Sequence, residues 1–289
     1  MKVFSLDTLE ELEKIVAATG GAEDLSLCVR LRVSSDYSEL SLASKFGIDL
    51  ADAAPLLQAT RQVADCLGIC FHVGSQAMTP FAYVQALERV RAAIVDASVT
   101  VDIIDVGGGF PSVYPGMEPP PLEDYFGVIH RASESLPISY SSELWCEPGR
   151  ALCAEYNSLI VRVEKRRGNE LYINDGAYGA LFDAAHVGWR FPVQRIGNTD
   201  ATADEEFAFY GPTCDDADYM EGPFVLPADT KAGDYIEIGM LGAYGAAMRP
   251  AFHGFGQGAS VPVADEPMAS LYRGDRADPR ESDNVVSLR

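Results

Sequence analysis

The first 150 residues alternate between two patterns of apolar positions. Apolar residues that recur every three or four positions predict amphipathic helices, which we place at Thr8–Ala18, Ala53–Leu67, Phe81–Asp96 and Leu122–Leu136. Short, mainly apolar runs between them predict buried strands, which we place at Leu25–Val33, Ile69–Val73, Val101–Val106 and Ser142–Glu147. This alternation is typical of a parallel sheet or a (β/α) barrel, but about four units are about half of what a closed barrel needs.

The pattern changes near Ala151, after which no long helical period appears. Alternating apolar and polar positions then predict strands, which we place at Leu159–Glu164, Leu171–Asn174, Phe207–Tyr210 and Tyr235–Ile238. We therefore expect a partial barrel over 1–150 and a mostly β domain over 151–263. Residues 264–289 are rich in charge, proline and serine, and we expect this tail to be mobile.

Composition narrows the classes of partner. The chain has 289 residues and is 47% hydrophobic, so it can bury a large core. Its net charge of −21 would repel phosphate backbones, so nucleic-acid binding is not expected. No apolar stretch is long enough to cross a membrane, and the acidic start does not resemble a signal peptide. The six cysteines show no zinc-type pairing and predict reduced thiols, no metal site and a cytoplasmic protein.

Three consecutive glycines, Gly107, Gly108 and Gly109, end one predicted strand. Glycine lets backbone N–H groups approach an anion with no Cβ in the way. In α/β folds the carboxyl ends of the strands are where phosphates and substrates bind. A tight turn explains the run equally well when it is considered alone.

Two other predicted strands end in residues suited to bind a phosphorylated aromatic ring. His72 is followed by Gly74 and Ser75, and its flat imidazole could stack on such a ring. Glu147 could hold a proton on a heteroaromatic nitrogen, as pyridoxal phosphate (PLP) requires. Arg150 could donate two hydrogen bonds to a phosphate. The plainer alternatives are a core histidine and a salt bridge on a turn.

The β domain contributes further candidates. Cys214 and Asp215 lie in a segment dense in reactive side chains, and Asp183 is an isolated acid in an apolar setting. For Asp216 and His186 we favour an ordinary structural role.

Five motifs occur together in an order and approximate spacing that resemble the eukaryotic-type ornithine decarboxylases. They are Phe71–Ser75, Gly107–Pro111, Glu147–Arg150, Asn174–Gly179 and Gly211–Asp215. The resemblance extends from about Phe4 to about Phe255. It implies an α/β plus all-β fold, namely the C-terminal half of a PLP-binding (β/α)8 barrel followed by a β-sandwich or β-barrel domain.

The resemblance also implies roles for individual residues. His72 would stack on the PLP ring, and Glu147 would pair with its pyridinium nitrogen. The residues that would hold or approach the rest of the cofactor are Arg32, Ser75, Gly107, Gly108, Gly109, Arg150 and Tyr244. Asp183 and Asp215 would bind the distal amine of a substrate, and Cys214 would return a proton after CO2 leaves. The implied protein is a homodimer with its active sites at the subunit interface, where Lys45 and Asp218 form an ion pair.

The implied reaction is decarboxylation of a basic amino acid in polyamine biosynthesis. Ornithine to putrescine is favoured, and lysine to cadaverine stays open because Phe182 replaces the tyrosine common in ornithine enzymes. A diaminopimelate decarboxylase is the alternative, but its distal carboxylate would be poorly matched to Asp183 and Asp215.

The lysine that the family links to PLP has no counterpart in this sequence, because none of its five lysines has a Tyr-Ala-Val-Lys-like context. We therefore expect an N-terminally shortened decarboxylase that is inactive alone. A non-catalytic, decarboxylase-like regulatory protein is the alternative, although the presence of Cys214 and Asp215 favours the enzyme.

Overall fold

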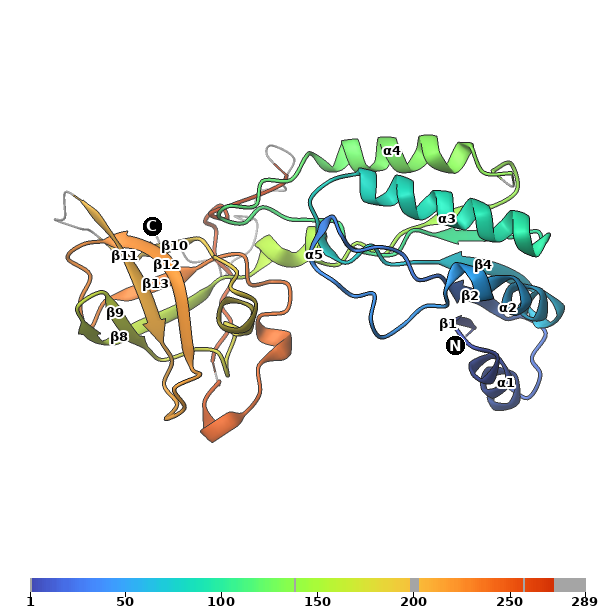
Figure 1. The fold of residues 1–289 in the computed structure, drawn as a ribbon. Coiled ribbons are helices and arrows are strands. Elements are labelled where there is room, and N and C mark those ends of the chain that lie inside the picture. The colour runs from blue at the N-terminus through green and yellow to red at the C-terminus, as the bar shows by residue number, and fades with distance from the viewer. Residues whose placement is uncertain (1, 138, 198–202, 257, 273–289) are drawn as a thin grey trace. The chain divides into compact units, whose positions relative to one another are not determined.

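A computed structural model describes residues 2–137, 139–197, 203–256 and 258–272 (Figure 1). The contacts divide the chain into two compact units. The first consists of residues 1–111 and 119–149, and the second of residues 112–118 and 150–289.

The first unit is built on a five-stranded sheet in which every neighbouring pair is parallel. The strand order is β1 (Val3–Leu6), β2 (Ser26–Arg30), β4 (Cys66–Cys70), β6 (Ile103–Asp105) and β7 (Glu143–Trp145). A separate pair is formed by β3 (Ser38–Leu40) and β5 (Ser75–Ala77). Because the five strands are parallel, all of their carboxyl ends meet at one edge of the sheet.

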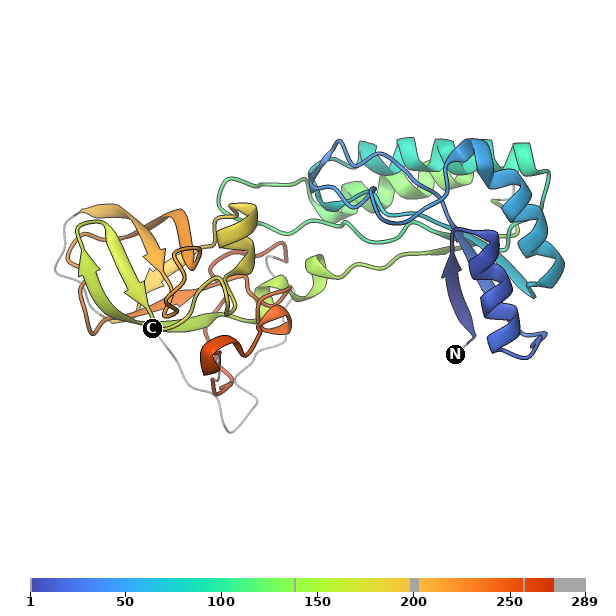
Figure 2. The ribbon, with the colours of Figure 1, turned by 60° about the horizontal axis from the view of Figure 1, so that its bottom comes forward.

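Helices connect these strands and pack on one another in chain order. They are α1 (Leu9–Ala18), α2 (Leu50–Val63), α3 (Phe81–Ala97) and α4 (Leu122–Glu134). Figures 1 and 2 show α3 and α4 lying side by side along the sheet. This strand and helix alternation confirms the α/β prediction for the first part of the chain.

Two sequence signals in this unit mislead. Asp7 precedes α1 but does not cap it: the hydroxyl of Thr8 accepts the Glu11 N–H, and the Asp7 carboxylate accepts the N–H of Gly47 instead. The helix predicted over Ala53–Leu67 extends too far, because α2 stops at Val63 and the chain continues into β4, which contains Gly68. A Cβ at Gly68 would lie 2.4 Å from Cys28 Sγ, so this position needs glycine for packing.

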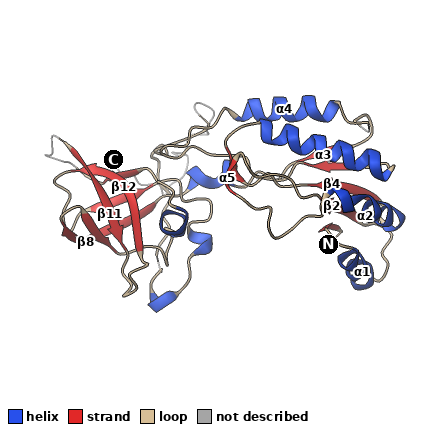
Figure 3. Ribbon diagram, viewed as in Figure 1, coloured by secondary structure: helices blue, strands red, loops and turns tan. Residues whose placement is uncertain are grey.

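The second unit is a six-stranded, mostly antiparallel sheet (Figure 3). Its order is β10 (Val193–Arg195), β13 (Tyr235–Ile238), β8 (Leu159–Arg167), β9 (Glu170–Ile173), β11 (Asp204–Tyr210) and β12 (Tyr219–Pro227). Only β9 and β11 pair in parallel among these strands as described. The outermost strands of this order, β10 and β12, also touch, so the sheet nearly closes on itself.

The inward positions of this sheet form one apolar core. Phe209 and Phe224 are fully buried and stack with ring centroids 3.9 Å apart. Short helical segments complete the unit at Arg150–Cys153 (α5), Ala154–Tyr156, Asp183–Val187, Ala246–Met248 and Phe252–Gly254. The prediction of a mostly β second half with no long helix is therefore confirmed for the described residues.

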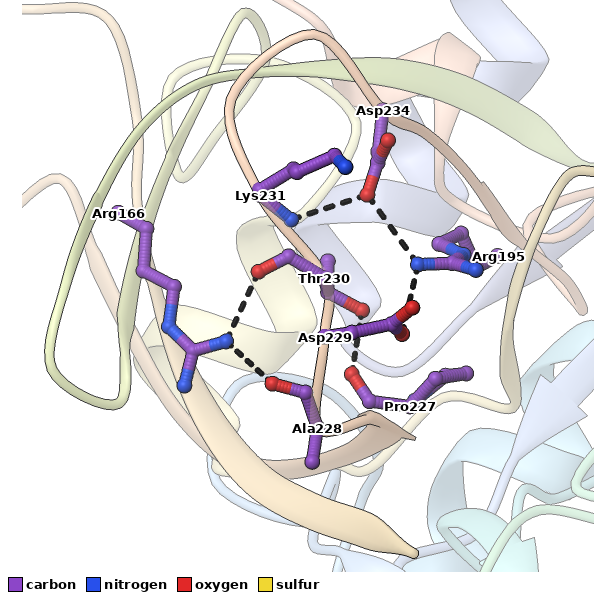
Figure 4. A network of polar contacts seen from close by, with 8 residues as sticks. All are labelled: Arg166, Arg195, Pro227, Ala228, Asp229, Thr230, Lys231 and Asp234. Atoms are coloured by element: carbon purple, nitrogen blue, oxygen red, sulfur yellow. Dashed lines mark hydrogen bonds and ion pairs between the residues drawn. The ribbon is translucent and has the colours of Figure 1, made fainter. Parts of the chain in front are cut away.

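Two arginines hold the turn between β12 and β13 from opposite sides (Figure 4). Arg166 donates to the carbonyls of Ala228 and Thr230, at 2.5 and 2.9 Å. Arg195, whose side chain is 7% exposed, pairs with Asp229 at 2.9 Å and Asp234 at 3.4 Å. The two guanidinium groups, which are buried or half-buried, therefore bind the carbonyl oxygens and the carboxylates of this one turn.

Of the expected mobile tail, residues 273–289 lie outside the described part of the chain. Within the described ranges, no helix combines the length and the apolar character that crossing a bilayer requires.

We expect Arg195→Met to lower the free energy of unfolding of the second unit by about 3 kcal/mol, because it leaves Asp229 and Asp234 without their buried cation. Urea unfolding in a Trp145→Phe background measures this, since the buried Trp189 is then the only tryptophan. Arg167→Met is the matched control: Arg167 is exposed, and its loss should cost less than about 0.5 kcal/mol. Equal losses in both variants would contradict the assignment.

Candidate functional site

Four neighbouring strands of the first unit place polar residues at the shared carboxyl edge of the sheet. Arg30 is the last residue of β2, His72 follows β4, Gly107–Gly109 follow β6, and Glu147 follows β7. The strands β2, β4, β6 and β7 are successive neighbours in the sheet. Residues that are far apart in the sequence are therefore brought to one edge, as in other α/β folds that bind ligands there.

The surrounding backbone requires glycine at two of the three positions of the run Gly107–Gly109. Gly107 has a φ of +66°, and a Cβ there would lie 2.0 Å from the carbonyl oxygen of Phe71. Gly109 has a φ of +98°, and its Cβ would lie 2.4 Å from the carbonyl oxygen of Gly74. The tight-turn explanation is therefore correct for these two residues.

Gly108 is different, because its missing side chain faces the candidate site residues. A Cβ there would lie 3.1 Å from His72 Nε2 and 2.9 Å from the carbonyl oxygen of Glu147. None of the hydrogen bonds recorded among the described residues uses the N–H groups of Gly108, Gly109 or Phe110. This cradle, which a side chain would fill, fits an anionic group such as the PLP phosphate.

The backbone around Ser75 bends in a similar way. Gly74 and Gln76, which flank it, both have positive φ values, of 101° and 59°. Glutamine seldom adopts this conformation, so the strain at Gln76 marks a turn that the surrounding structure enforces. Ser75 is buried within this turn, three residues after His72. His72 Nδ1 accepts the N–H of Gly74 at 3.1 Å.

His72 is held as a neutral ring. Burial lowers the pKa of His72, and the positive charge of Arg30 lowers it further. Since Nδ1 accepts a hydrogen bond from Gly74, the proton of the neutral ring belongs on Nε2. A neutral, oriented imidazole is suited to lie against a flat aromatic ligand.

Glu147 lies in an electrostatic setting that favours its protonated form. Its pKa is raised by burial and by the neighbouring Asp105, while Arg30 opposes the rise. Asp105 is 7% exposed and accepts the Gly107 N–H at 2.9 Å, and burial raises its pKa as well. A pair of neighbouring acids whose pKa values are raised can hold a proton at this edge, which is what a pyridine nitrogen needs from its partner.

Arg30, which the sequence analysis missed, is the arginine whose charge acts on both His72 and Glu147. Arg32, which we expected near the cofactor, instead forms an ion pair with Asp49 at 3.1 Å. The structure supplies the distinction: β2 ends at Arg30, in register with Cys70, and Arg32 is two residues beyond that end, whereas the predicted strand Leu25–Val33 included both.

The second unit carries a separate cluster around Arg150, whose residue surface is 6% exposed. The guanidinium donates to the Tyr114 hydroxyl at 3.0 Å, and its carbon lies 4.2 Å from the ring centroid of Trp189 and 4.8 Å from that of Tyr244. Asp183 lies 4.0 Å away, and burial raises its pKa while Arg150 lowers it. The structure thus brings together three predicted residues, Arg150, Asp183 and Tyr244.

Tyr114 and Trp189 are members of this cluster that sequence reasoning missed. Both are buried aromatic residues, and the sequence alone does not distinguish them from ordinary core positions. Two irregularities mark the same place: Tyr244 has a φ of 63°, and Asp183 begins a π-helical turn. Such irregularities are frequent where the backbone positions functional side chains.

Cys214 and Asp215 lie in an exposed loop of the second unit. The Tyr178 hydroxyl donates to Asp215 Oδ2 at 2.5 Å. Asp218, which we expected to face another subunit, is 1% exposed and bonded within its own unit. The ammonium group of Lys45, its expected partner, lies 5.0 Å from the ring centroid of Phe46.

All five lysines are described, and all are exposed (Lys2, Lys14, Lys45, Lys165 and Lys231). Lys2 pairs with Asp24 and Lys14 with Glu11. Among the described residues, then, no buried lysine amine stands at the carboxyl edge of the parallel sheet.

Comparison with known proteins gives a consistent result. Residues 1–154 match the family described as pyridoxal-dependent decarboxylase, pyridoxal binding domain. The lysine/ornithine decarboxylase of Selenomonas ruminantium is 29% identical over 272 residues, which cover 91% of this chain and 67% of that protein. Antizyme inhibitor 2 of Xenopus laevis is 29% identical and covers 89% of this chain and 60% of its own length.

A solved structure supports both halves of the fold. The lysine/ornithine decarboxylase of Vibrio vulnificus, solved with cadaverine, superposes with a TM-score of 0.73 at 29% identity. The match covers 89% of this chain and 68% of that one, so the chain spans about two thirds of the proteins it resembles. The family match extends over more than half of the sequence and includes the glycine cradle, His72 and Glu147. The chain therefore belongs to the pyridoxal-dependent decarboxylases.

Proposed function

We propose that this chain contributes the PLP-binding and substrate-binding residues of a basic amino-acid decarboxylase, with ornithine or lysine as substrate. The observation that carries the proposal is the carboxyl edge of the parallel sheet. There Glu147, with its pKa raised by burial and Asp105, shares one edge with the neutral His72 and the open glycine cradle. PLP supplies the electron sink for decarboxylation when it is bound.

Each residue of the first unit has a distinct task in this proposal. Glu147 holds a proton at the pyridine nitrogen, and His72 lies against the ring. The N–H groups that follow Gly107, together with Ser75, hold the phosphate. Burial and Asp105 favour the protonated form of Glu147, and Arg30 moderates this effect by lowering the pKa of Glu147.

The acids of the second unit support a substrate with a distal ammonium group. Asp183 and Asp215 carry carboxylates, which suit a distal ammonium group better than a distal carboxylate. Cys214 is an exposed thiol that can donate a proton. The named relatives include lysine/ornithine decarboxylases. We further propose a homodimer in which Cys214 and Asp215 serve the partner's site, as the resemblance implies.

A regulatory protein is the second candidate. The exposure of all five lysines favours it, because a decarboxylase of this family needs a lysine to bind PLP covalently. The similarity to antizyme inhibitor 2 points in the same direction. In this case PLP binding would be weak or absent.

We expect PLP to bind the purified chain, and Glu147→Gln to weaken this binding about tenfold, because one charge-assisted hydrogen bond is worth about 1.5 kcal/mol or more. Titration calorimetry measures the affinity. Glu143→Gln is the control, since Glu143 begins β7, the strand that Glu147 follows, and accepts the indole N–H of Trp145. Equal affinities for both variants would argue against the assignment of Glu147.

We expect no single lysine of the isolated chain to be linked stoichiometrically to PLP, because no buried lysine amine stands at the carboxyl edge of the parallel sheet among the described residues. Borohydride reduction of the chain with equimolar PLP, followed by peptide mass spectrometry, tests this. A relative that carries the family's lysine serves as the positive control. Stoichiometric modification of one lysine would show that the expectation is wrong.

We expect negligible CO2 release from the chain with PLP alone, and slow release when methylamine is added, because a small primary amine can replace a missing lysine amine. Ornithine and lysine should react faster than diaminopimelate, since Asp183 and Asp215 repel a distal carboxylate. Glu147→Gln should reduce the rescued rate. Preference for diaminopimelate would refute the proposed substrate class, and no rescue together with weak or absent PLP binding would favour the regulatory candidate.

A further inference from the structure

Asp218 is the buried centre of the loop that carries Cys214 and Asp215. Its Oδ2 accepts the N–H and the hydroxyl of Thr213, at 3.0 and 2.8 Å. Its backbone N–H donates to the carbonyl oxygen of Asp215, and its carbonyl oxygen accepts the N–H of Gly211. The loop is therefore closed on a carboxylate that is 1% exposed.

The same carboxylate joins this loop to a second segment. Oδ1 of Asp218 accepts the N–H of Ala177 at 2.7 Å, so residues 211–218 are tied to residues 174–181. A Cβ at Gly176 or at Gly211 would lie 2.1 Å from this oxygen. The carboxylate thus fills the space of two absent side chains, and glycine is needed at both positions.

The second segment then contacts Asp215 through Tyr178. The Tyr178 hydroxyl donates to Asp215 Oδ2 at 2.5 Å, while its ring packs on Phe252 with centroids 4.7 Å apart. The segment is fixed from its other end by Asp175, which accepts the N–H groups of Gly176 and Ala180 and pairs with Arg249 at 2.6 Å. Asp215 therefore accepts a hydrogen bond from Tyr178, whose position is fixed by its packing on Phe252 and by the contacts of Asp175.

We propose that Asp218 is a positioning residue that locks the Cys214–Asp215 loop against Tyr178 within a single chain. The carboxylate of Asp215 is then oriented before any ligand or second subunit arrives. The importance of this orientation for substrate rests on the proposed function, in which Asp215 binds the distal ammonium group. The lock itself rests on the hydrogen bonds of Asp218 alone.

The inter-subunit ion pair of Asp218 with Lys45 stays an expectation, and the lock does not depend on it. Both oxygens of Asp218 accept hydrogen bonds from N–H and hydroxyl donors of its own unit. The residue is 1% exposed in the single chain. Burying the Asp218 carboxylate without these donors would be energetically costly, so the carboxylate and its donors depend on one another.

The titration of Asp215 reports on the lock. The hydrogen bond from Tyr178 is the main cause that lowers the pKa of Asp215, followed by the Ala217 N–H and the charge of His253. The other groups that face it are the phenol of Tyr178 and, through the loop, the carboxylate of Asp218. If the loop loosens, the Tyr178 bond is lost and the pKa of Asp215 rises toward its ordinary value.

The test is carbon-13 NMR titration of the aspartate carboxyl groups in the full chain, without PLP. Asp218→Asn keeps the shape of the side chain but replaces one acceptor by a donor, so it should raise the pKa of Asp215 as Tyr178→Phe does. Asp216→Asn is the control, because Asp216 is exposed in the same loop; it should leave the titration of Asp215 unchanged. Amide exchange at Ala177 should become about tenfold faster in Asp218→Asn.

A milder pair of variants covers the case in which Asp218→Asn fails to fold. Thr213→Val removes one donor to Asp218 and should shift the pKa of Asp215 in the same direction, whereas Thr213→Ser keeps the donor and should restore it. An unchanged Asp215 titration in folded Asp218→Asn or Thr213→Val would overturn the proposal. Because no measurement uses PLP or turnover, failure of the proposed decarboxylase function would leave these outcomes unaffected.

Discussion

The parallel pairing of β4, β6 and β7 is the constraint on which the first unit depends. Parallel strands bring their carboxyl ends to one edge, and the close approach of Gly107 to the Phe71 carbonyl lets the chain leave β6 without disturbing β4. His72, Gly108 and Glu147 can therefore lie together although they are far apart in the sequence. The acid, the ring and the anion cradle follow from one backbone arrangement.

The second unit depends on buried charged side chains, whereas the first depends on the shared edge of its parallel strands. Arg150 lies in an aromatic cluster, Arg195 and Arg166 hold a turn, and Asp218 closes a loop. Each of these charges is satisfied by groups that are distant in sequence. The removal of one partner would leave the other buried and uncompensated, so these contacts fix the loops of a sheet that would otherwise allow several loop conformations.

The sequence predicted much of this, because it carries two kinds of signal. Apolar periodicity found α3, β8 and β13, and motif order found the family. It failed where tertiary contacts decide: the helix predicted to reach Leu67 runs into β4, where Gly68 faces Cys28, and the strand predicted to reach Val33 ends at Arg30. Tyr114 and Trp189 could not be found, since their partner Arg150 becomes their neighbour only after folding.

The space that Asp218 occupies links its own tolerance of change to that of Gly211. The three atoms nearest to a Cβ at Gly211 all belong to the Asp218 carboxylate, whereas a Cβ at Gly176 would also lie 2.8 Å from the Cα of Gly211. Substitutions at Gly211 and Asp218 are thus expected to show epistasis, with a harmful change at Gly211 becoming milder in an Asp218-deficient background, while Gly176 stays intolerant in either background. Such coupling would make Gly211 and Asp218 vary together during the divergence of related chains.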